Sequence, residues 1–312
     1  MRYSGIGGQA IMEGVMMRNG DNYAVAVRLP DKSVHVEVHK TKGMNATIQK
    51  IPLVRGVYTF FWSLVIGLQS LMESASYFEE EEGAKPAKEL TEEETKRKER
   101  KEKAEMGGTL LLSFVLALGI FMALPYGLST LIGRFVESKT LLAFIEGVLR
   151  VAIFVIYIAV ISMTDDIKRT FMYHGAEHKC INCIESGLEL TVENVRKSTR
   201  FHKRCGTSFL FIVLLISIFV FMFIRMDSHL LQLLMRLLLV PVIAGVSYEF
   251  IRLAGRSENP VVGLLSKPGL WMQKLTTKEP DDDMIQVGIA SVEAVFDWKK
   301  FLAGDEEHCC IS

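Results

Sequence analysis

Two histidines and one glutamate form the motif with the clearest chemical meaning in this sequence. His174, Glu177 and His178 fill the pattern His-x-x-Glu-His. On a helix, residues four positions apart project from neighbouring points of one face, so both imidazoles can reach the same ion. In zinc hydrolases with this residue order, the histidines bind the metal and the glutamate acts as the general base. The motif therefore predicts a helix that holds a divalent metal ion, with zinc as the favoured ion and Glu177 as the catalytic base.

A second pair of metal-ligand residue types follows further along the chain. Two imidazoles alone do not make a stable site, and His202 and Cys205 offer a third imidazole and a thiolate. Three protein ligands and a water molecule are typical of a catalytic zinc site, whereas four protein ligands close the tetrahedron and make the site structural. The sequence leaves both alternatives open, because it does not show which of the four side chains meet.

The other cysteines give weaker signals. Cys180 and Cys183 are spaced as Cys-x-x-Cys, which can hold zinc or exchange disulfides, but no βαβ pattern surrounds them. We interpret both as incidental small residues in preference to ligands. Cys309 and Cys310 lie on a C-terminal tail and receive no role. Five cysteines at such uneven spacing do not form a disulfide framework, and they suit a reducing compartment or a metal site.

The composition favours a membrane protein over a soluble enzyme. Of 312 residues, 49% are hydrophobic, and the mean hydropathy is +0.25. The 36 Lys and Arg residues balance 36 Asp and Glu residues, so the chain has no overall basic field with which to hold nucleic acid. We therefore predict no nucleic-acid partner. The charged residues are concentrated between long apolar segments, and those segments must position the candidate site.

Four apolar segments are long enough to cross a bilayer as helices. They cover residues 109–133, 140–163, 206–224 and 230–254. The polar segments 79–105 and 164–206 each hold eight Lys or Arg residues, whereas the two short connections inside the apolar pairs hold three in total. Basic residues accumulate on the cytoplasmic side of membrane proteins. The sequence therefore predicts an α-helical integral protein of the cell membrane, with two transmembrane hairpins and its main polar segments in the cytoplasm.

The two predicted transmembrane hairpins cover residues 109–163 and 206–254 and separate the other parts of the chain. The other predicted parts are an N-terminal β-containing region at 1–55, an interfacial or re-entrant helix at 56–75, a charged linker at 76–108, the ligand-bearing segment at 164–205 and a C-terminal region at 255–312. The helix at 56–75 is at the short limit for a span. If it crossed the membrane, it would place the basic N-terminal region outside the cell, against the charge rule.

Two local patterns add detail. Apolar and polar residues alternate over 23–29 and 33–39 around Pro30, which predicts a small β-hairpin. Near the C-terminus, an acidic start is followed by apolar residues on one helical stripe, which predicts an amphipathic helix. The stripe consists of Ile285, Ile289, Val292 and Phe296.

Five charged residues lie inside the predicted spans: Glu146 and Arg150 in the second, and Arg236, Glu249 and Arg252 in the fourth, where the last two lie near the predicted cytoplasmic end. A charge in lipid costs about 3 kcal/mol or more unless it is paired or hydrated. Glu146 and Arg150 stand four positions apart and can satisfy each other, whereas Arg236 needs a partner from another segment. A structural clamp and a path for protons or substrate are both open readings.

Four stretches resemble the YqhQ-like family, also called domain of unknown function 1385. They are GGQAIMEGVMMR, YHGAEHK, HKRCGTSFL and NPVVGLLSKPGLWMQKLTTKEPDD. The resemblance covers nearly the whole chain and implies a bacterial membrane protein of a family described as predicted metal-dependent enzymes. The chain departs from the expected pattern at Lys203, where we expect Pro, and at Cys180 and Cys183, where we expect other residues.

The resemblance also implies which positions belong to the family's motifs. His174, Glu177, His178, His202 and Cys205 fall on two central motifs. Gln9, Glu13 and Arg18 fall on an N-terminal one.

These observations favour a metal-dependent hydrolase at the cytoplasmic face of the membrane. Gln9, Glu13 and Arg18 are then candidates to surround the metal or to bind substrate. A site beside two span ends suits a lipid, a lipid-linked molecule or a membrane-protein segment as substrate.

Two rival hypotheses remain at this stage. In the first, the chain is a non-enzymatic scaffold or biogenesis factor with a structural metal. In the second, less favoured, it is a small transporter that uses the charged residues within the spans and assembles as a homo-oligomer.

Overall fold

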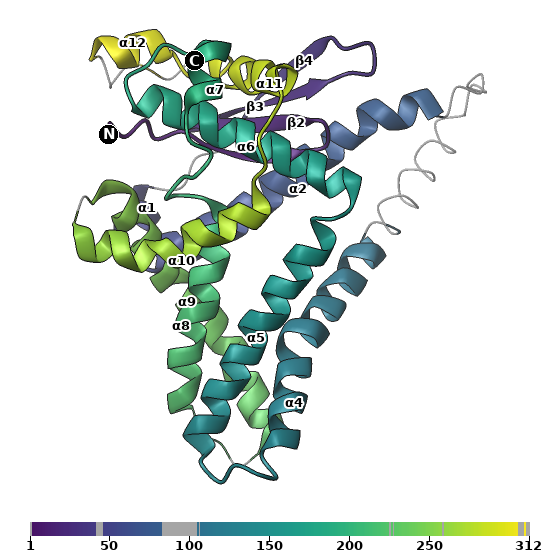
Figure 1. Ribbon diagram of the computed structural model, residues 1–312, viewed down its shortest axis with the longest axis vertical. Coiled ribbons are helices and arrows are strands. Elements are labelled where there is room, and N and C mark those ends of the chain that lie inside the picture. The colour runs from purple at the N-terminus through teal and green to yellow at the C-terminus, as the bar shows by residue number, and fades with distance from the viewer. Residues whose placement is uncertain are drawn as a thin grey trace.

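The computed structural model describes residues 2–41, 46–82, 105, 107–224, 226, 228–257, 259–304 and 309. Most of the predicted charged linker, and Cys310, lie outside these residues. Figure 1 shows two parts, a unit built around a β-sheet and a long bundle of helices that extends from it.

An antiparallel sheet forms the centre of the first part. Its strands are β1 (Gly7–Ile11), β2 (Gly14–Asn19), β3 (Asn22–Arg28) and β4 (Val34–Lys40), and they pair in sequential order. The hairpin predicted around Pro30 is confirmed, because β3 pairs with β4 and the backbone N–H of Leu29 donates to the carbonyl of Ser33. The structure also contains a second hairpin, β1–β2, which the sequence pattern did not predict.

Helices cover both faces of the sheet. Alternate residues of a strand point to opposite faces: Val15 and Met17 join the core formed with α6 (Asp165–Glu185) and α11 (Asp282–Glu293), whereas Met16 faces α2 (Val54–Glu82). The sheet thus lies between α2 on one face and α6 with α11 on the other (Figure 1).

Helix α2 corresponds to the predicted interfacial or re-entrant element, and it is longer than predicted. It runs without interruption to Glu82, so the predicted start of the linker at residue 76 is too early. Tyr77 and Phe78 pack against the core on the α2 face of the sheet, which explains why the helix continues. A short helix, α1 (Ala46–Lys50), precedes it.

Among the described residues, four helices are long and apolar enough to cross a membrane. They are Gly107–Ile132, Lys139–Ile161, Gly206–Phe223 and Leu230–Arg256, close to the four predicted spans. The first contains a π-helical turn, η1 (Gly119–Ala123), followed by α4 (Leu124–Ile132); the others are α5 (Lys139–Ile161), α8 (Gly206–Phe223) and α9 (His229–Arg256). Helix α5 contacts α4 and α8, and α8 contacts α9. These helices indicate a membrane protein.

Three of the charged residues predicted inside the spans meet in the helical bundle. The Glu146 carboxylate accepts hydrogen bonds from Arg150 on the same helix and from Arg236 on α9. All three residues are at most 4% exposed. Arg236, which has no partner within its own helix, finds one in Glu146. This charged cluster, Glu146, Arg150 and Arg236, links α5 to α9.

The same cluster explains the π-helical turn. Pro125 has no backbone N–H, so it cannot donate to a carbonyl one turn earlier. The carbonyl of Phe121 instead accepts a hydrogen bond from Arg150 Nε, at 2.9 Å. Arg150 also donates to the Ser217 hydroxyl on α8. The cluster therefore joins all four long helices through hydrogen bonds.

Three further helices complete the fold: α7 (Val192–Lys197), α10 (Pro260–Thr276) and α12 (Trp298–Ala303). The predicted amphipathic helix is α11, which begins after the capping residue Asp281. Of its predicted stripe, Ile285 and Val292 are fully buried, while Phe296 packs into the core just after the helix ends. Helix α10 crosses the bundle where it meets the sheet unit (Figure 1).

Candidate metal centre

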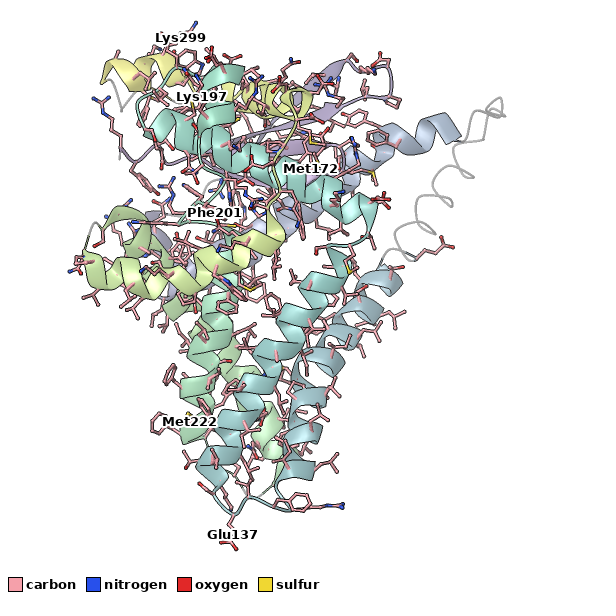
Figure 2. The ribbon with its side chains drawn as sticks, viewed as in Figure 1. Glu137, Met172, Lys197, Phe201, Met222 and Lys299 are labelled. Carbon is pink, nitrogen blue, oxygen red and sulfur yellow. The ribbon has the colours of Figure 1, made fainter. Side chains whose placement is uncertain are left out.

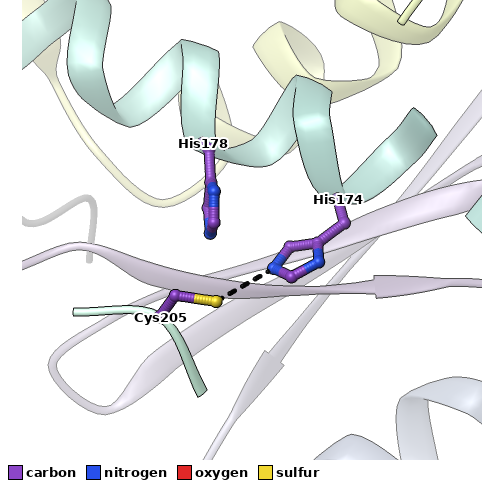
Figure 3. A group of neighbouring side chains, drawn as sticks. All are labelled: His174, His178 and Cys205. Carbon is purple, nitrogen blue, oxygen red and sulfur yellow. Dashed lines mark hydrogen bonds between the residues drawn. The ribbon is translucent and has the colours of Figure 1, made fainter. Parts of the chain in front are cut away.

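Helix α6 presents the His-x-x-Glu-His motif towards the start of α8. His174, Glu177 and His178 lie in the middle part of α6, and every residue of this helix from Gly175 to Glu185 is buried. Cys205 is the N-terminal capping residue of α8, and its sulfur accepts a hydrogen bond from the Thr207 backbone N–H. Figure 3 shows both imidazoles projecting from α6 towards the Cys205 thiol, which comes from a separate segment.

The distances between these donor atoms suit a single metal ion. His174 Nε2 lies 3.3 Å from Cys205 Sγ, and one donor atom from each of His174, His178 and Cys205 lies within 4.8 Å of the others. Tetrahedral zinc, with bonds of about 2.0 to 2.3 Å, separates its ligand atoms by roughly 3.5 Å. Two imidazoles and one thiolate are also ligands that zinc prefers. The three residues therefore fit a zinc ion with small adjustments.

Backbone carbonyls fix the orientation of both imidazoles. His174 Nδ1 lies 2.8 Å from the carbonyl oxygen of Thr276, and His178 Nδ1 lies 2.6 Å from that of Arg200. A carbonyl only accepts hydrogen bonds, so each Nδ1 must carry the proton. Each Nε2 is then the ring nitrogen that faces the site. Histidines that bind metals are typically oriented in this way.

Two polar atoms at this centre lack partners. Nε2 of His178 and Oε2 of Glu177 are buried and have no hydrogen-bond partner among the described residues. A buried polar atom without a partner is costly. His178 belongs to the group of possible ligands with Cys205, and Glu177 Oε2 lies 4.0 Å from His174 Nε2, so a cation held by that group would satisfy both atoms.

The environment favours a charged thiolate. Burial alone would raise the pKa of Cys205, but the neighbouring His174 and His178 imidazoles outweigh it and hold this pKa well below its ordinary value. Burial would likewise lower the pKa of His174, yet the Cys205 sulfur and Glu177 raise it to about 9. The deprotonated thiol is the form that binds metals.

Glu177 is a buried carboxyl group with a raised pKa. Burial raises the pKa of its carboxyl group, although His178 and His174 oppose the shift. Its Oε2 lies 4.0 Å from His174 Nε2. The backbone N–H of Gly8 on β1 hydrogen-bonds the carboxylate from the sheet side.

Gly8 allows the sheet to approach Glu177 closely, and this gives a testable prediction. A Cβ at position 8 would lie 2.7 Å from the carbonyl oxygen of Met16 and 2.9 Å from Glu177 Cγ. We expect Gly8→Ala to lower the free energy of unfolding by about 1–3 kcal/mol, the usual cost of overpacking, and to weaken metal retention. Thermal unfolding and elemental analysis measure both.

Gly7→Ala is the matched control for that substitution. A Cβ at Gly7 meets no atom within 4 Å, so this variant should behave like the unmodified protein. Equal stability of the two variants would contradict the close approach at Gly8.

His202 is not part of the three-ligand group. Its Nε2 lies 3.7 Å from the Glu185 carboxylate, and its backbone is held by two hydrogen bonds to the Gln273 amide. Burial lowers the pKa of His202. Burial would raise the pKa of Glu185, but hydrogen bonds from His202 and Arg204 outweigh it and lower this pKa to about 2. The sequence proposed His202 and Cys205 as a second pair of possible ligands. Of these two, the structure brings Cys205 to His174 and His178.

The N-terminal candidates lie away from the metal centre. Gln9 donates to the carbonyl of Gly67, and Arg18 stacks on Trp62, both on α2 across the sheet. Glu13, in the turn between β1 and β2, binds Arg169 through two hydrogen bonds. The structure does not gather these three residues at the site.

Some residues that shape the site gave no usable signal in the sequence. Thr276 and Arg200 contribute backbone carbonyls, which every residue type possesses. Gly175 is an exception, because a glycine inside the His-x-x-Glu-His motif is visible in the sequence. The structure explains it, since a Cβ at position 175 would lie 2.0 Å from the Lys278 carbonyl oxygen. A glycine inside the His-x-x-Glu-His motif thus admits the segment between α10 and α11.

The Cys-x-x-Cys pair lies in the core. Cys180 and Cys183 are fully buried among apolar side chains of α6, α11 and the sheet. Burial raises the pKa of both thiols, so both favour the protonated form, which does not bind metal.

Comparisons with known proteins identify a family and name no reaction. Residues 51–298 match a family described as "Protein of unknown function (DUF1385)". The chain is 36% identical over 296 residues to "Uncharacterized protein YqhQ" of Bacillus subtilis (strain 168), covering 91% of this chain and 90% of the relative. No solved structure gives a significant match.

Proposed function

Because this chain belongs to the DUF1385 family, whose description names no reaction, we propose from its own site that it is a metal-dependent hydrolase of the cell membrane. His174, His178 and Cys205 bind the metal ion, and Glu177 is the general base. The observation that carries this proposal is the pair of buried, unpartnered atoms, His178 Nε2 and Glu177 Oε2, at a centre whose histidines favour the thiolate of Cys205.

The arrangement supports hydrolysis because each group has a separate task. A zinc ion, when bound, would act as a Lewis acid and lower the pKa of a water molecule to about 7. Three protein ligands leave a fourth position open for that water. Glu177, with its raised pKa, takes up the proton and transfers it to the leaving group. The Thr276 and Arg200 carbonyls keep both imidazoles in the tautomer that binds metal.

The connections of the site support a location at the membrane surface. Helix α6 follows α5 almost directly, and Cys205 caps α8, so both ligand-bearing elements begin where a candidate span ends or starts. With α4 and α5 as one hairpin and α8 and α9 as the other, the excess of basic residues favours the cytoplasmic side for the site. This position favours a lipid, a lipid-linked molecule or a membrane-protein segment as substrate.

Glu177→Gln tests the base. The substitution keeps the size of the side chain, so we expect the protein to retain its metal while hydrolysis of chromogenic carboxylic and phosphate ester probes falls by about 10²–10⁴-fold, the usual contribution of a general base. Metal content is measured by elemental analysis, and the rate is measured in detergent. The control is Glu189→Gln, an exposed glutamate just beyond α6.

A structural metal site is the second candidate, and one distance favours it. Glu177 Oε2 lies 4.0 Å from His174 Nε2, near enough for the carboxylate to become the fourth ligand and close the tetrahedron. The chain would then be a scaffold. In that case Glu177→Gln would lose metal and stability together, and an unchanged rate with the metal retained would exclude Glu177 as the base.

A further inference from the structure

Helix α10 exposes large apolar residues and packs polar residues against the protein, which is unusual for a helix in water. Four of its large apolar side chains are exposed, with Val261 at 62%, Leu264 at 60%, Leu265 at 54% and Trp271 at 52%. The side that packs against the protein carries the small and polar residues Ser266, Gly269, Gln273 and Thr276, together with the apolar Met272. A helix at the surface of a soluble protein shows the reverse arrangement.

The inward side of α10 is fixed at the ends of the membrane-length helices. The Gln273 amide donates to the Ser208 hydroxyl near the start of α8 at 2.7 Å. Gly269 packs against the same serine, since a Cβ at Gly269 would lie 2.9 Å from Ser208 Cβ. Helix α10 also follows closely on the end of α9 at Arg256. Its exposed side is therefore continuous with the ends of these helices, where lipid headgroups meet acyl chains.

Two lysines border the apolar side. Lys267 and Lys274 are seven positions apart, so they stand two turns apart on nearly the same side of the helix, and both are exposed. Lysines in this position can extend their ammonium groups to lipid phosphates while their alkyl chains cover apolar surface.

We propose that α10 lies in the membrane–water interface and binds the lipid surface directly. Its apolar residues enter the boundary between headgroups and acyl chains, and its lysines contact phosphates, as in interfacial helices elsewhere. The helix crosses the bundle instead of running along it (Figure 1), which is the orientation that an interfacial helix requires. This inference concerns a lipid-binding surface and does not depend on hydrolysis.

The position of α10 connects the lipid surface to the metal centre. The last turn of the helix supplies the Thr276 carbonyl that accepts from His174, and Gln273 holds the backbone of His202. One helix therefore contacts both the lipid and the residues around the metal.

Tryptophan fluorescence tests the proposal in the full-length protein. The chain has three tryptophans, so Trp62→Phe with Trp298→Phe leaves Trp271 as the reporter. In phosphatidylcholine vesicles with brominated acyl chains, we expect Trp271 emission to be quenched. Quenching should be stronger with bromines near the headgroup than with bromines near the chain ends.

The matched control leaves Trp298 as the only tryptophan, through Trp62→Phe with Trp271→Phe. Trp298 begins α12, and its neighbour Lys299 lies at the opposite end of the molecule from Glu137 at the tip of the bundle (Figure 2). Its emission should not respond to the brominated lipids. If a double variant fails to fold, the single variant Trp271→Phe should remove most of the quenching seen in the unmodified protein.

Unquenched emission from Trp271 in folded protein would overturn the proposal. Emission that is shielded from lipid and also depends on protein concentration would assign the apolar side to a second copy of the chain, and would overturn it as well. Metal content and hydrolysis are measured separately, so a failure of the lipid test is distinct from a failure of the hydrolase proposal.

Discussion

His178→Ala and Cys205→Ser are each expected to reduce the bound metal from about one equivalent per chain to a small fraction. Each substitution leaves two of three proposed ligands, which are too few for a stable zinc site. The loss should occur without unfolding, because the ligands form only a small part of the core around α6. Elemental analysis of protein purified without added metal, with thermal unfolding in parallel, measures both quantities.

His202→Gln is the control that separates this structure from other ligand sets. His202 lies beside Glu185 instead of joining the three-ligand group, so we expect this variant to keep most of its metal. If it lost metal as completely as Cys205→Ser, His202 would have to be a ligand and the site would have four. Full retention of metal in Cys205→Ser would contradict the proposed centre altogether.

Glu146→Gln is expected to lower the stability of the helical bundle by about 3–5 kcal/mol, the usual cost of breaking a buried ion pair. Its carboxylate binds two buried guanidinium groups, those of Arg150 and Arg236, and glutamine would leave two positive charges without an opposite charge. Unfolding in detergent, followed by circular dichroism against temperature or denaturant, measures the change.

Glu137→Gln is a control for the same chemical change at an exposed site. Glu137 lies in the connection between α4 and α5 (Figure 2), and its substitution should alter stability by less than about 0.5 kcal/mol. Replacing Glu146, Arg150 and Arg236 together by leucine should restore much of the lost stability, because apolar residues can replace a buried ionic cluster. Equal stability of Glu146→Gln and Glu137→Gln would contradict a stabilising role of the charged cluster.

The sequence predicted the membrane-length helices well because their signal is local. A long apolar segment with few charges predicts a membrane-length helix without information from the rest of the chain. The four helices found agree with the predicted segments within a few residues. The same holds for the β3–β4 hairpin and for α11, whose periodicity is regular. The pairing of Glu146 with Arg150 was also predictable, since four positions on a helix bring side chains together.

The composition of the metal centre was predictable only in part. The spacing of His174 and His178 determined that they share a helical face, but the choice between His202 and Cys205 depends on how the chain turns into α8. The position of Cys205 as the first capping residue of α8 brings its sulfur to His174. His202, three residues earlier, is held by Gln273 from a helix far away in the sequence.

The N-terminal candidates illustrate a different difficulty. Gln9 and Gly8 are neighbours on β1, and successive strand residues point to opposite faces. The strand therefore places Gly8 against Glu177 and turns Gln9 towards α2. The β1–β2 hairpin was not evident in this glycine-rich stretch, so the face to which each residue points could not be assigned from the sequence.

The contacts that orient His174 and His178 also bear on how this protein tolerates change over evolution. Both rings are held by main-chain oxygens, of Thr276 and Arg200, and no replacement of a side chain removes a main-chain oxygen. Mutations at positions 200 and 276 can therefore accumulate without releasing either ring, provided that the local chain path is preserved. Sequence variation at these two positions among homologous proteins would be compatible with an intact centre.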